Sequence, residues 1–164
     1  MAHLGNINSL DLNLLPEEVL ALQQGTYGEA ANQPYEVKKM VMQSAINRLL
    51  SGKTKEFGRT IPEILNKGYY AVKNKNKPYT EALSGKFNNP LSQEAWKETQ
   101  QVYNDIMKNR DFGNAMFYFK PQEVENIMSN KNGKKIFNFS KVVPLGTVGE
   151  YSVFTYPSTR HNKR

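Results

Sequence analysis

Cysteine is absent from the 164-residue chain, and histidine is close to absent. The lack of cysteine excludes a disulfide framework, thiolate catalysis and zinc sites of the cysteine type. The two histidines, His3 and His161, lie near the ends of the sequence, so a histidine-based metal site or a Ser-His-Asp triad is not expected. We therefore predict that the protein uses neither a metal nor another cofactor.

Long apolar runs are also missing, because no stretch approaches the roughly 20 residues that a helix needs to cross a membrane. The hydrophobic fraction is 38% and the mean hydropathy is -0.66, which is typical of a rather polar domain without a membrane span. The N-terminal stretch MAHLGNINSLDLNLL has neither a basic region nor a continuous apolar region. It therefore does not predict a secretory signal.

Positive charge is in excess, with a net charge of +7 and a pI of about 9.5. This excess favours a polyanionic partner, such as nucleic acid, an anionic membrane surface or a bacterial cell wall, without choosing among them. Part of it lies in three basic clusters, residues 73–77, 131–135 and 160–164, which solvated loops and a tail would also explain. The sequence has no helix-turn-helix or aromatic RNA-binding signature, so nucleic acid is not favoured as a partner.

Helical periodicity dominates a single predicted domain at residues 16–157, which follows a lead-in at 1–15 and precedes a basic tail at 158–164. First-turn prolines, capping residues and apolar spacing predict five helices, at residues 16–30, 34–51, 60–67, 92–109 and 121–129. Ser92 is the expected cap of the fourth helix.

The segments between these helices predict loops and a few strands. Residues 73–91 are rich in lysine, asparagine, proline and glycine and are expected to form a long loop. Residues 132–135 suggest a turn, and residues 115–119 a short buried strand. Two further strands, separated by Pro-Leu-Gly, are expected within residues 136–156. The sum is an α+β fold, a mainly helical domain with a small antiparallel β element.

Glu29 is the residue that the helical periodicity singles out. At about 100° per residue, four side chains share one stripe of the first helix: Val19, Leu22, Thr26 and Glu29. That stripe should face the core, where burial disfavours the charged form of a carboxyl group. Gly25 and Gly28 lie beside Glu29, and each costs about 1 kcal/mol relative to alanine in a helix interior. The close approach of a ligand or of another helix would compensate for that cost.

Two interpretations of Glu29 remain open on the residues alone. A carboxylic acid sheltered in a cleft is the group that general-acid cleavage of a glycosidic bond requires. Alternatively, Glu29 is simply exposed at a fraying helix end, since a stripe with one polar terminal member is common.

Four segments, taken in order, are similar to the motifs of one enzyme family. YGEAANQPYEVKKMVMQSAINRL resembles the pattern A-E-A-x-G-E-P followed by an apolar helix that ends V-x-N-R, and TIPEILNKGYYAV resembles T-x-x-x-V-x-x-x-G-x-F-S-x-V. DFGNAMFYFKP resembles D-x-T-x-G-A-x-x-[FY]-x-x-P with one residue missing, and TVGEYSVF resembles a closing strand I-G-x-H-x-F. The family is that of spore-cortex-lytic cell-wall hydrolases of the SleB type. The matching positions are Glu29, Ala30, Pro34, Ile46, Asn47, Arg48, Gly68, Tyr70, Asp111, Ala115, Tyr118, Phe119, Pro121 and Gly149.

The resemblance covers about residues 18–155. It implies a lysozyme-like fold and cleavage of peptidoglycan glycan strands between N-acetylmuramic acid and N-acetylglucosamine, with the family's catalytic glutamate at Glu29. The chain departs from the motifs at several positions: Asn32 and Gln33 stand for G-E, Tyr69 for a polar residue, Ala71 for a serine and Tyr151 for a histidine. These departures concern subsite contacts and leave the acid in place.

Glycosidases usually employ two carboxylates, and Glu36, Asp111 and Glu150 are candidates for the second. The resemblance instead implies a lytic transglycosylase, in which one glutamic acid first protonates the bridging oxygen and then acts as the base. The product would carry a 1,6-anhydro end, and hydrolysis of the muramidase type is the alternative. Four tyrosines in the matched segments are expected to line a glycan groove, with core packing as the alternative for each: Tyr69, Tyr70, Tyr118 and Tyr151.

A non-enzymatic virion or scaffold protein that retains the hydrolase fold is the main competing interpretation. Without a secretory signal, a wall hydrolase is expected to be a phage protein, either carried in the virion or held in the host cytoplasm before release for lysis. Its expected partners are then peptidoglycan glycan strands and other virion or tail proteins.

Overall fold

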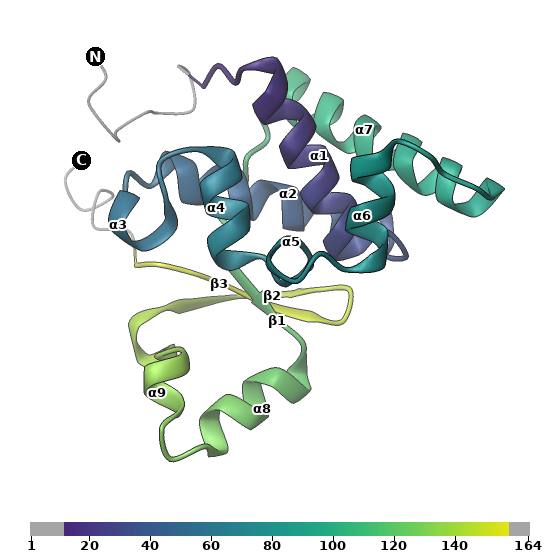
Figure 1. Ribbon diagram of the computed structural model, residues 1–164. Helices are drawn as coiled ribbons and strands as arrows, with labels where there is room; N and C mark the ends of the chain where they lie inside the picture. Colours follow the sequence, from purple (N-terminus) through teal and green to yellow (C-terminus); the bar gives the residue numbers. More distant parts are fainter. Residues whose placement is uncertain (1–11, 158–164) are drawn as a thin grey trace. The chain divides into compact units, whose positions relative to one another are not determined.

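The computed structural model describes residues 12–157 (Figure 1). The two histidines, most of the N-terminal lead-in and the basic tail lie outside these residues. The chain divides into two compact units, with the division between Gly113 and Asn114.

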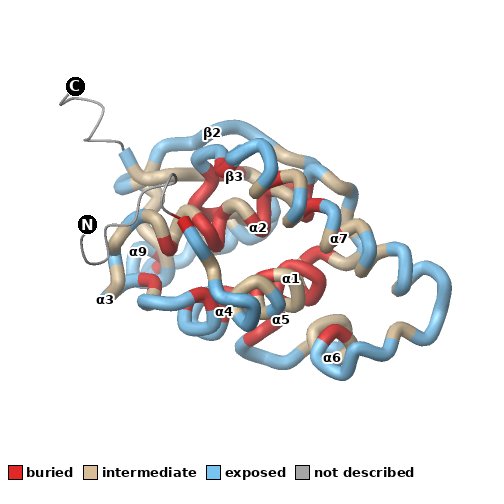
Figure 2. The backbone as a smooth tube through the Cα atoms, turned by 90° about the horizontal axis from the view of Figure 1, so that it is seen from above, coloured by how far each residue is buried: buried red, intermediate tan, exposed pale blue. Residues whose placement is uncertain are grey.

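The first unit consists of helices arranged around one central helix. Its elements are α1 (Pro16–Ala30), α2 (Tyr35–Leu50), α3 (Thr54–Phe57), α4 (Ile61–Gly68), α5 (Tyr70–Lys73), α6 (Lys77–Ser84) and α7 (Pro90–Asn109). The central helix α1 packs against α2, α4, α5, α6 and α7. Buried residues are accordingly frequent along α1 and α2 (Figure 2).

Local sequence signals explain where several of these helices begin and end. The side chains of Thr60, Asn76 and Asn89 accept hydrogen bonds from the first turns of α4, α6 and α7, and each of these helices has a proline in its first turn. Gly85 follows α6 with φ +73°, a left-handed conformation that glycine adopts without steric cost.

Two sequence predictions in this region are wrong. The expected loop at residues 73–91 contains helix α6 and the start of α7, because Asn76 and Gly85 supply a start and a stop signal within the polar stretch. Ser92 does not cap α7, which begins at Pro90. Its cap is Asn89, whose Oδ1 accepts the Ser92 N–H at 2.8 Å.

The second unit holds a small sheet with two helices between its first and second strands. Its elements are β1 (Phe117–Phe119), α8 (Pro121–Ser129), α9 (Gly133–Ile136), the 3-10 helix Phe139–Lys141, β2 (Val143–Val148) and β3 (Tyr151–Thr155). The strands pair antiparallel in the order β1-β3-β2. Aromatic side chains pack beside the sheet, and the ring centroids of Phe117 and Phe137 lie 4.8 Å apart.

The predicted strand positions in this unit require correction. The expected break at Pro-Leu-Gly lies inside β2, an edge strand that tolerates proline, and an irregularity between Pro144 and Gly146 accommodates the extra residue. The turn falls instead at Gly149, which has φ +59° between β2 and β3. The expected turn at residues 132–135 is mostly the short helix α9.

The sequence prediction of a mainly helical α+β fold with a small antiparallel β element is confirmed. Helices α1 and α8 have the predicted bounds, and α2 and α4 differ from them by one residue at each end. Within residues 12–157, no helix is both long and apolar enough to cross a membrane.

Candidate functional site

Glu29 lies at the end of α1 and is half-buried, on the stripe that includes the buried residues Leu22 and Thr26. Its Oε2 accepts a hydrogen bond from the backbone N–H of Ala71, at 2.8 Å. Ala71 is in the first turn of α5, where backbone N–H groups have no partner within the helix. The carboxylate therefore satisfies one of these groups, and α5 in turn fixes the position of the carboxylate.

The two glycines beside Glu29 allow other helices to approach α1 closely. A Cβ on Gly28 would lie 2.8 Å from Cβ of Tyr79 and 3.1 Å from Cβ of Ala71. A Cβ on Gly25 would lie 3.0 Å from the methyl groups of Leu65. Of the two explanations that the sequence left open for these glycines, helix packing is the one present here.

Asn76 adds a direct link between this part of α1 and helix α6. Its Nδ2 donates to the carbonyl of Gly28 at 3.1 Å, while its Oδ1 accepts the N–H of Tyr79 at 2.9 Å. One side chain thus caps α6 and ties it to the residue that precedes Glu29. The sequence signal for this role was an asparagine two residues before a proline, and the interpretation of residues 73–91 as a loop missed it.

Tyr69 is buried and does not line a groove in this structure, since it is only 1% exposed. Its hydroxyl lies 2.6 Å from Oγ of Ser44, and the Arg48 guanidinium lies over its ring, 4.8 Å from the centroid. Burial raises the pKa of Tyr69, and the charge of Glu29 raises it further, whereas Arg48 and Ser44 act in the opposite direction. Tyr69 therefore packs as a core residue, which is the alternative that the sequence left open, and its contact with glycan stays a prediction.

The segment Asn47-Arg48 at the end of α2 has a structural role. Nδ2 of Asn47 donates to the carbonyl of Phe112 at 2.9 Å. Arg48 lies over the rings of both Phe57 and Tyr69. A Cβ on Gly68 would meet Nη1 of Arg48 at 2.3 Å, so glycine at this position leaves room for the guanidinium.

Tyr70, the neighbour of Tyr69, is 70% exposed on the first turn of α5. It follows Tyr69 by one position and precedes Ala71, whose N–H binds Glu29. Of the two tyrosines predicted on this segment, Tyr70 is thus the one that is accessible.

Tyr118 and Tyr151 belong to the second unit. They lie on the paired strands β1 and β3, with ring centroids 5.5 Å apart in an edge-on arrangement. Tyr151 is 8% exposed, and Tyr118 is half-buried. Tyr151 therefore packs largely as a core residue, and Tyr118 presents the more accessible ring of the pair.

The three candidates for a second carboxylate have different surroundings. Asp111 forms an ion pair with Lys39 at 2.6 Å, and Glu150 pairs with Lys120 at 3.9 Å. Glu36 is exposed in the first turn of α2, where a negative charge suits the helix dipole. Their surroundings do not select one of them as a partner for Glu29.

A buried lysine was not recognised from the sequence. The side chain of Lys38 is 2% exposed, and its Nζ donates to the carbonyl of Ala31 at 3.1 Å and to that of Gln33 at 2.5 Å. It also pairs with Oε1 of Glu98 on α7 at 3.1 Å. Lys38 thus joins the turn between α1 and α2 to α7, which identifies it as a structural cation.

Tyr27, which lies on α1 near Glu29 in sequence, connects three helices through its ring and hydroxyl. Its hydroxyl donates to Oε1 of Glu81 at 2.6 Å, and its ring packs edge-on against those of Phe87 and Trp96. Burial, followed by the hydrogen bond to Glu81, raises the pKa of Tyr27 to about 12. This cluster stabilises the packing of α1 against α6 and α7.

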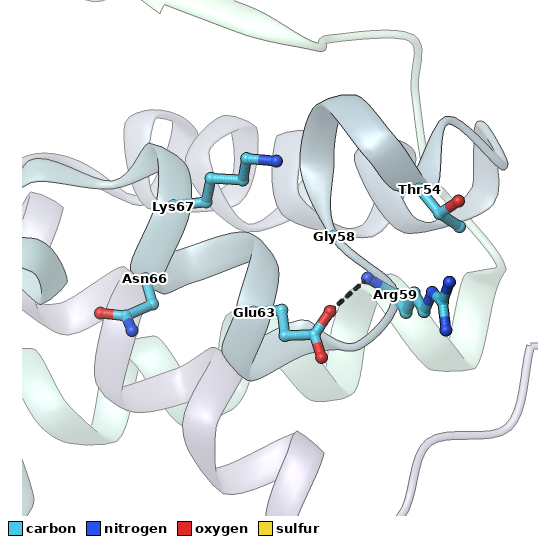
Figure 3. Close-up of a pocket in the computed structure, with 6 residues that line it drawn as sticks. All are labelled: Thr54, Gly58, Arg59, Glu63, Asn66 and Lys67. Carbon is cyan, nitrogen blue, oxygen red and sulfur yellow. Dashed lines mark hydrogen bonds between the residues drawn. The ribbon is translucent and has the colours of Figure 1, made fainter.

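A pocket of about 330 Å³ lies between α3 and α4 (Figure 3). Its polar groups mainly hold the backbone in place, since Oε1 of Glu63 accepts the N–H of Arg59 at 2.8 Å and Nζ of Lys67 donates to the carbonyl of Lys55 at 2.7 Å. A second pocket of about 600 Å³ adjoins Lys38 and α7, and a third of about 440 Å³ lies in the second unit. Glu29 lines none of these three.

Among the described residues, no group of three or more acidic or histidine side chains is placed to hold a metal ion. Comparison of the chain with family models, curated proteins and solved structures finds no match.

Proposed function

We propose that the protein cleaves peptidoglycan glycan strands, with Glu29 as the general acid. The observation that carries the proposal is the placement of this carboxylate, which is half-buried on the core-facing stripe of α1 and oriented by the Ala71 N–H. A catalytic acid needs this combination of partial shelter from water and a fixed position. The order of the four sequence motifs that resemble SleB-type hydrolases also supports the assignment.

The proposed mechanism needs a single carboxyl group. Glu29 donates its proton to the bridging oxygen, the glycosidic bond breaks, and the oxocarbenium-like centre is captured by the 6-hydroxyl of the same muramic acid residue. The Glu29 carboxylate then takes the proton of that hydroxyl, and the product ends in a 1,6-anhydro ring. If water is the nucleophile instead, the same residue activates it and the product has a reducing end.

A non-enzymatic structural role is the second candidate, and one observation favours it. The hydrogen bond from Ala71 to Glu29 satisfies the first turn of α5. This contact explains a carboxylate at position 29 without catalysis. The two candidates therefore differ in whether the carboxyl group must exchange a proton.

Glu29→Gln separates the two roles, because a glutamine side chain keeps an oxygen that accepts the Ala71 N–H but does not act as an acid. The measurement is clearing of purified peptidoglycan in a zymogram. The wild type is expected to clear the gel, and Glu29→Gln to lose at least about a hundredfold in activity with an unchanged unfolding midpoint. Glu17→Gln, which removes the same charge at an exposed position in the first turn of α1, is the matched control and should retain activity. Equal clearing by wild type and Glu29→Gln would refute the assignment.

A further inference from the structure

The second unit contains a basic pocket that the proposed chemistry at Glu29 does not use. It has a volume of about 440 Å³ and lies around the connection from α8 through α9 to the 3-10 helix. The basic cluster at residues 131–135, which the sequence left as a solvated loop, contributes three lysines to its lining: Lys131, Lys134 and Lys135. Within residues 12–157, none of these lysines has an acidic partner.

Aromatic and amide side chains complete the lining. Phe137 and Phe139 line the pocket, with ring centroids 4.8 Å apart and planes inclined by 68°. Oδ1 of Asn138 is engaged by the N–H and hydroxyl of Ser140, which orients the amide of Asn138. The pocket thus combines cations, ring surfaces and hydrogen-bonding groups.

The shape of the pocket depends on Gly133. A Cβ at this position would lie 1.9 Å from the carbonyl oxygen of Ile127, at the end of α8, so no other residue fits without displacing the backbone. The N–H of Gly133 donates to the carbonyl of Asn130 at 2.8 Å, and its own carbonyl accepts the N–H of Phe137 at 2.8 Å. These contacts join three residues that line the pocket, Asn130, Gly133 and Phe137.

The geometry points to this pocket as a binding site for an acidic sugar. The lysines provide charge complementarity for a carboxylate, and the aromatic rings provide surfaces for the C–H face of a pyranose. A flat nucleobase would favour a slot between parallel rings, whereas these two rings are strongly inclined to one another. The choice of muramic acid as the acidic sugar rests on the proposed function, but the charge and shape of the pocket do not.

Two matched sugars test the charge requirement. N-acetylmuramic acid and N-acetylglucosamine share the same ring and acetamido group, and the first also carries a lactyl carboxylate. Each sugar is titrated into the full chain, and binding is followed by NMR. N-acetylmuramic acid should shift the signals of Phe137 and Phe139, and the protein should bind N-acetylglucosamine about tenfold more weakly. Absence of shifts at the pocket with millimolar N-acetylmuramic acid, or equal binding of the two sugars, would overturn the proposal. Tighter binding of uridine monophosphate would overturn the sugar assignment.

Charge-removing variants locate the binding. The triple variant Lys131→Gln, Lys134→Gln, Lys135→Gln should weaken binding about tenfold or more, and more strongly at low salt. The matched control is Lys73→Gln, Lys75→Gln, Lys77→Gln, which removes the same charge from exposed positions of the first unit and should leave binding unchanged. Equal losses in both variants would show that only net charge matters and would refute the pocket.

The variant Glu29→Gln distinguishes this inference from the proposed function. It should leave the shifts of Phe137 and Phe139 with N-acetylmuramic acid as they are in the wild type, because Glu29 is not among the residues that line the pocket. If wild type fails to cleave glycan but the pocket lysines still determine binding, the proposed function fails and the binding site stands. If cleavage depends on Glu29 while the triple lysine variant binds normally, the proposed function stands and the binding site fails.

Discussion

Gly28 and Gly25 illustrate how a single missing side chain positions the candidate acid. Both lie on buried parts of α1, yet their neighbours differ. The Cβ of Tyr79 and the Cβ of Ala71 approach Gly28, and neither can move without moving its backbone. The flexible end of Leu65 approaches Gly25. The position of Ala71, and therefore the hydrogen bond to Glu29, depends on the first contact more than on the second.

We expect Gly28→Ala to lower the free energy of unfolding by about 1–2 kcal/mol, because overpacking outweighs the gain of about 1 kcal/mol in helix propensity. Gly25→Ala should change it by less than about 1 kcal/mol, since the Leu65 side chain can rotate and the same propensity gain applies. Urea denaturation measures both. If Gly28→Ala proves as stable as the wild type, close packing of α1 against α5 and α6 does not constrain this site.

The pair Tyr27–Glu81 predicts a dependence of stability on alkaline pH. The folded pKa of about 12 is raised above the ordinary value of 10.0, so the unfolded chain loses this proton first as the pH rises. The stabilisation is therefore fully present below pH 10 and is lost as the pH rises toward about 12. Tyr27→Phe should cost about 1–2 kcal/mol at neutral pH, and the difference from wild type should shrink between pH 10 and pH 12. A difference that stays constant over this range would contradict the assignment.

Lys38 shows how elements far apart in sequence are held together by one buried charge. The carbonyl groups of the α1–α2 turn and the carboxylate of Glu98 surround its ammonium group. Lys39, its neighbour, forms a more exposed ion pair with Asp111. The two adjacent lysines therefore offer a matched comparison between a buried and a surface charge.

Lys38→Met should lower the free energy of unfolding by about 3 kcal/mol, because it leaves two carbonyl groups without their donor and breaks the pair with Glu98. Lys39→Met should cost less than about 1 kcal/mol, as is usual for surface ion pairs. Thermal and urea unfolding of the two variants measure the difference. Equal losses would mean that Lys38 is not the link between the α1–α2 turn and α7.

Helix boundaries were predictable where proline and acidic residues mark a first turn, as at Pro16 and Pro121, because these signals act within a few residues. The start of α6 at Lys77 was missed, since the lysine- and asparagine-rich composition of the stretch obscured its cap, Asn76. The hairpin was misplaced because a proline that suits an edge strand was taken for a turn. In each case the local sequence signal was present, but tertiary contacts decided which structure it formed.

The candidate site was also predictable only in part, because some of its contacts come from distant segments. The stripe that contains Glu29 follows from helical periodicity alone. Its partial burial does not, because periodicity left open that Glu29 is exposed at a fraying helix end. The partner of the carboxylate, the N–H of Ala71, comes from a helix 42 positions away and has no local signal. Burial of Tyr69 and Lys38 likewise depends on residues of other helices, which periodicity within one segment does not reveal.

At the scale of the whole molecule, the chain has two units that carry different chemistry. The first, built around α1, carries the half-buried carboxylate of Glu29 and the exposed ring of Tyr70. The second carries a small antiparallel sheet and a pocket lined by lysines and phenylalanines. The proposed acid thus lies in the first unit and the proposed sugar pocket in the second, and each is tested by itself.

Mass spectrometry of purified glycan strands incubated with the protein tests the central claim most directly. The wild type is expected to release muropeptide or disaccharide fragments with 1,6-anhydro ends, which are lighter by one water than hydrolysed fragments. Glu29→Gln should release none, while Glu17→Gln should match the wild type. Intact strands after incubation with a folded wild type, or the same fragments from Glu29→Gln, would contradict the account of Glu29 as the acid that cleaves glycan.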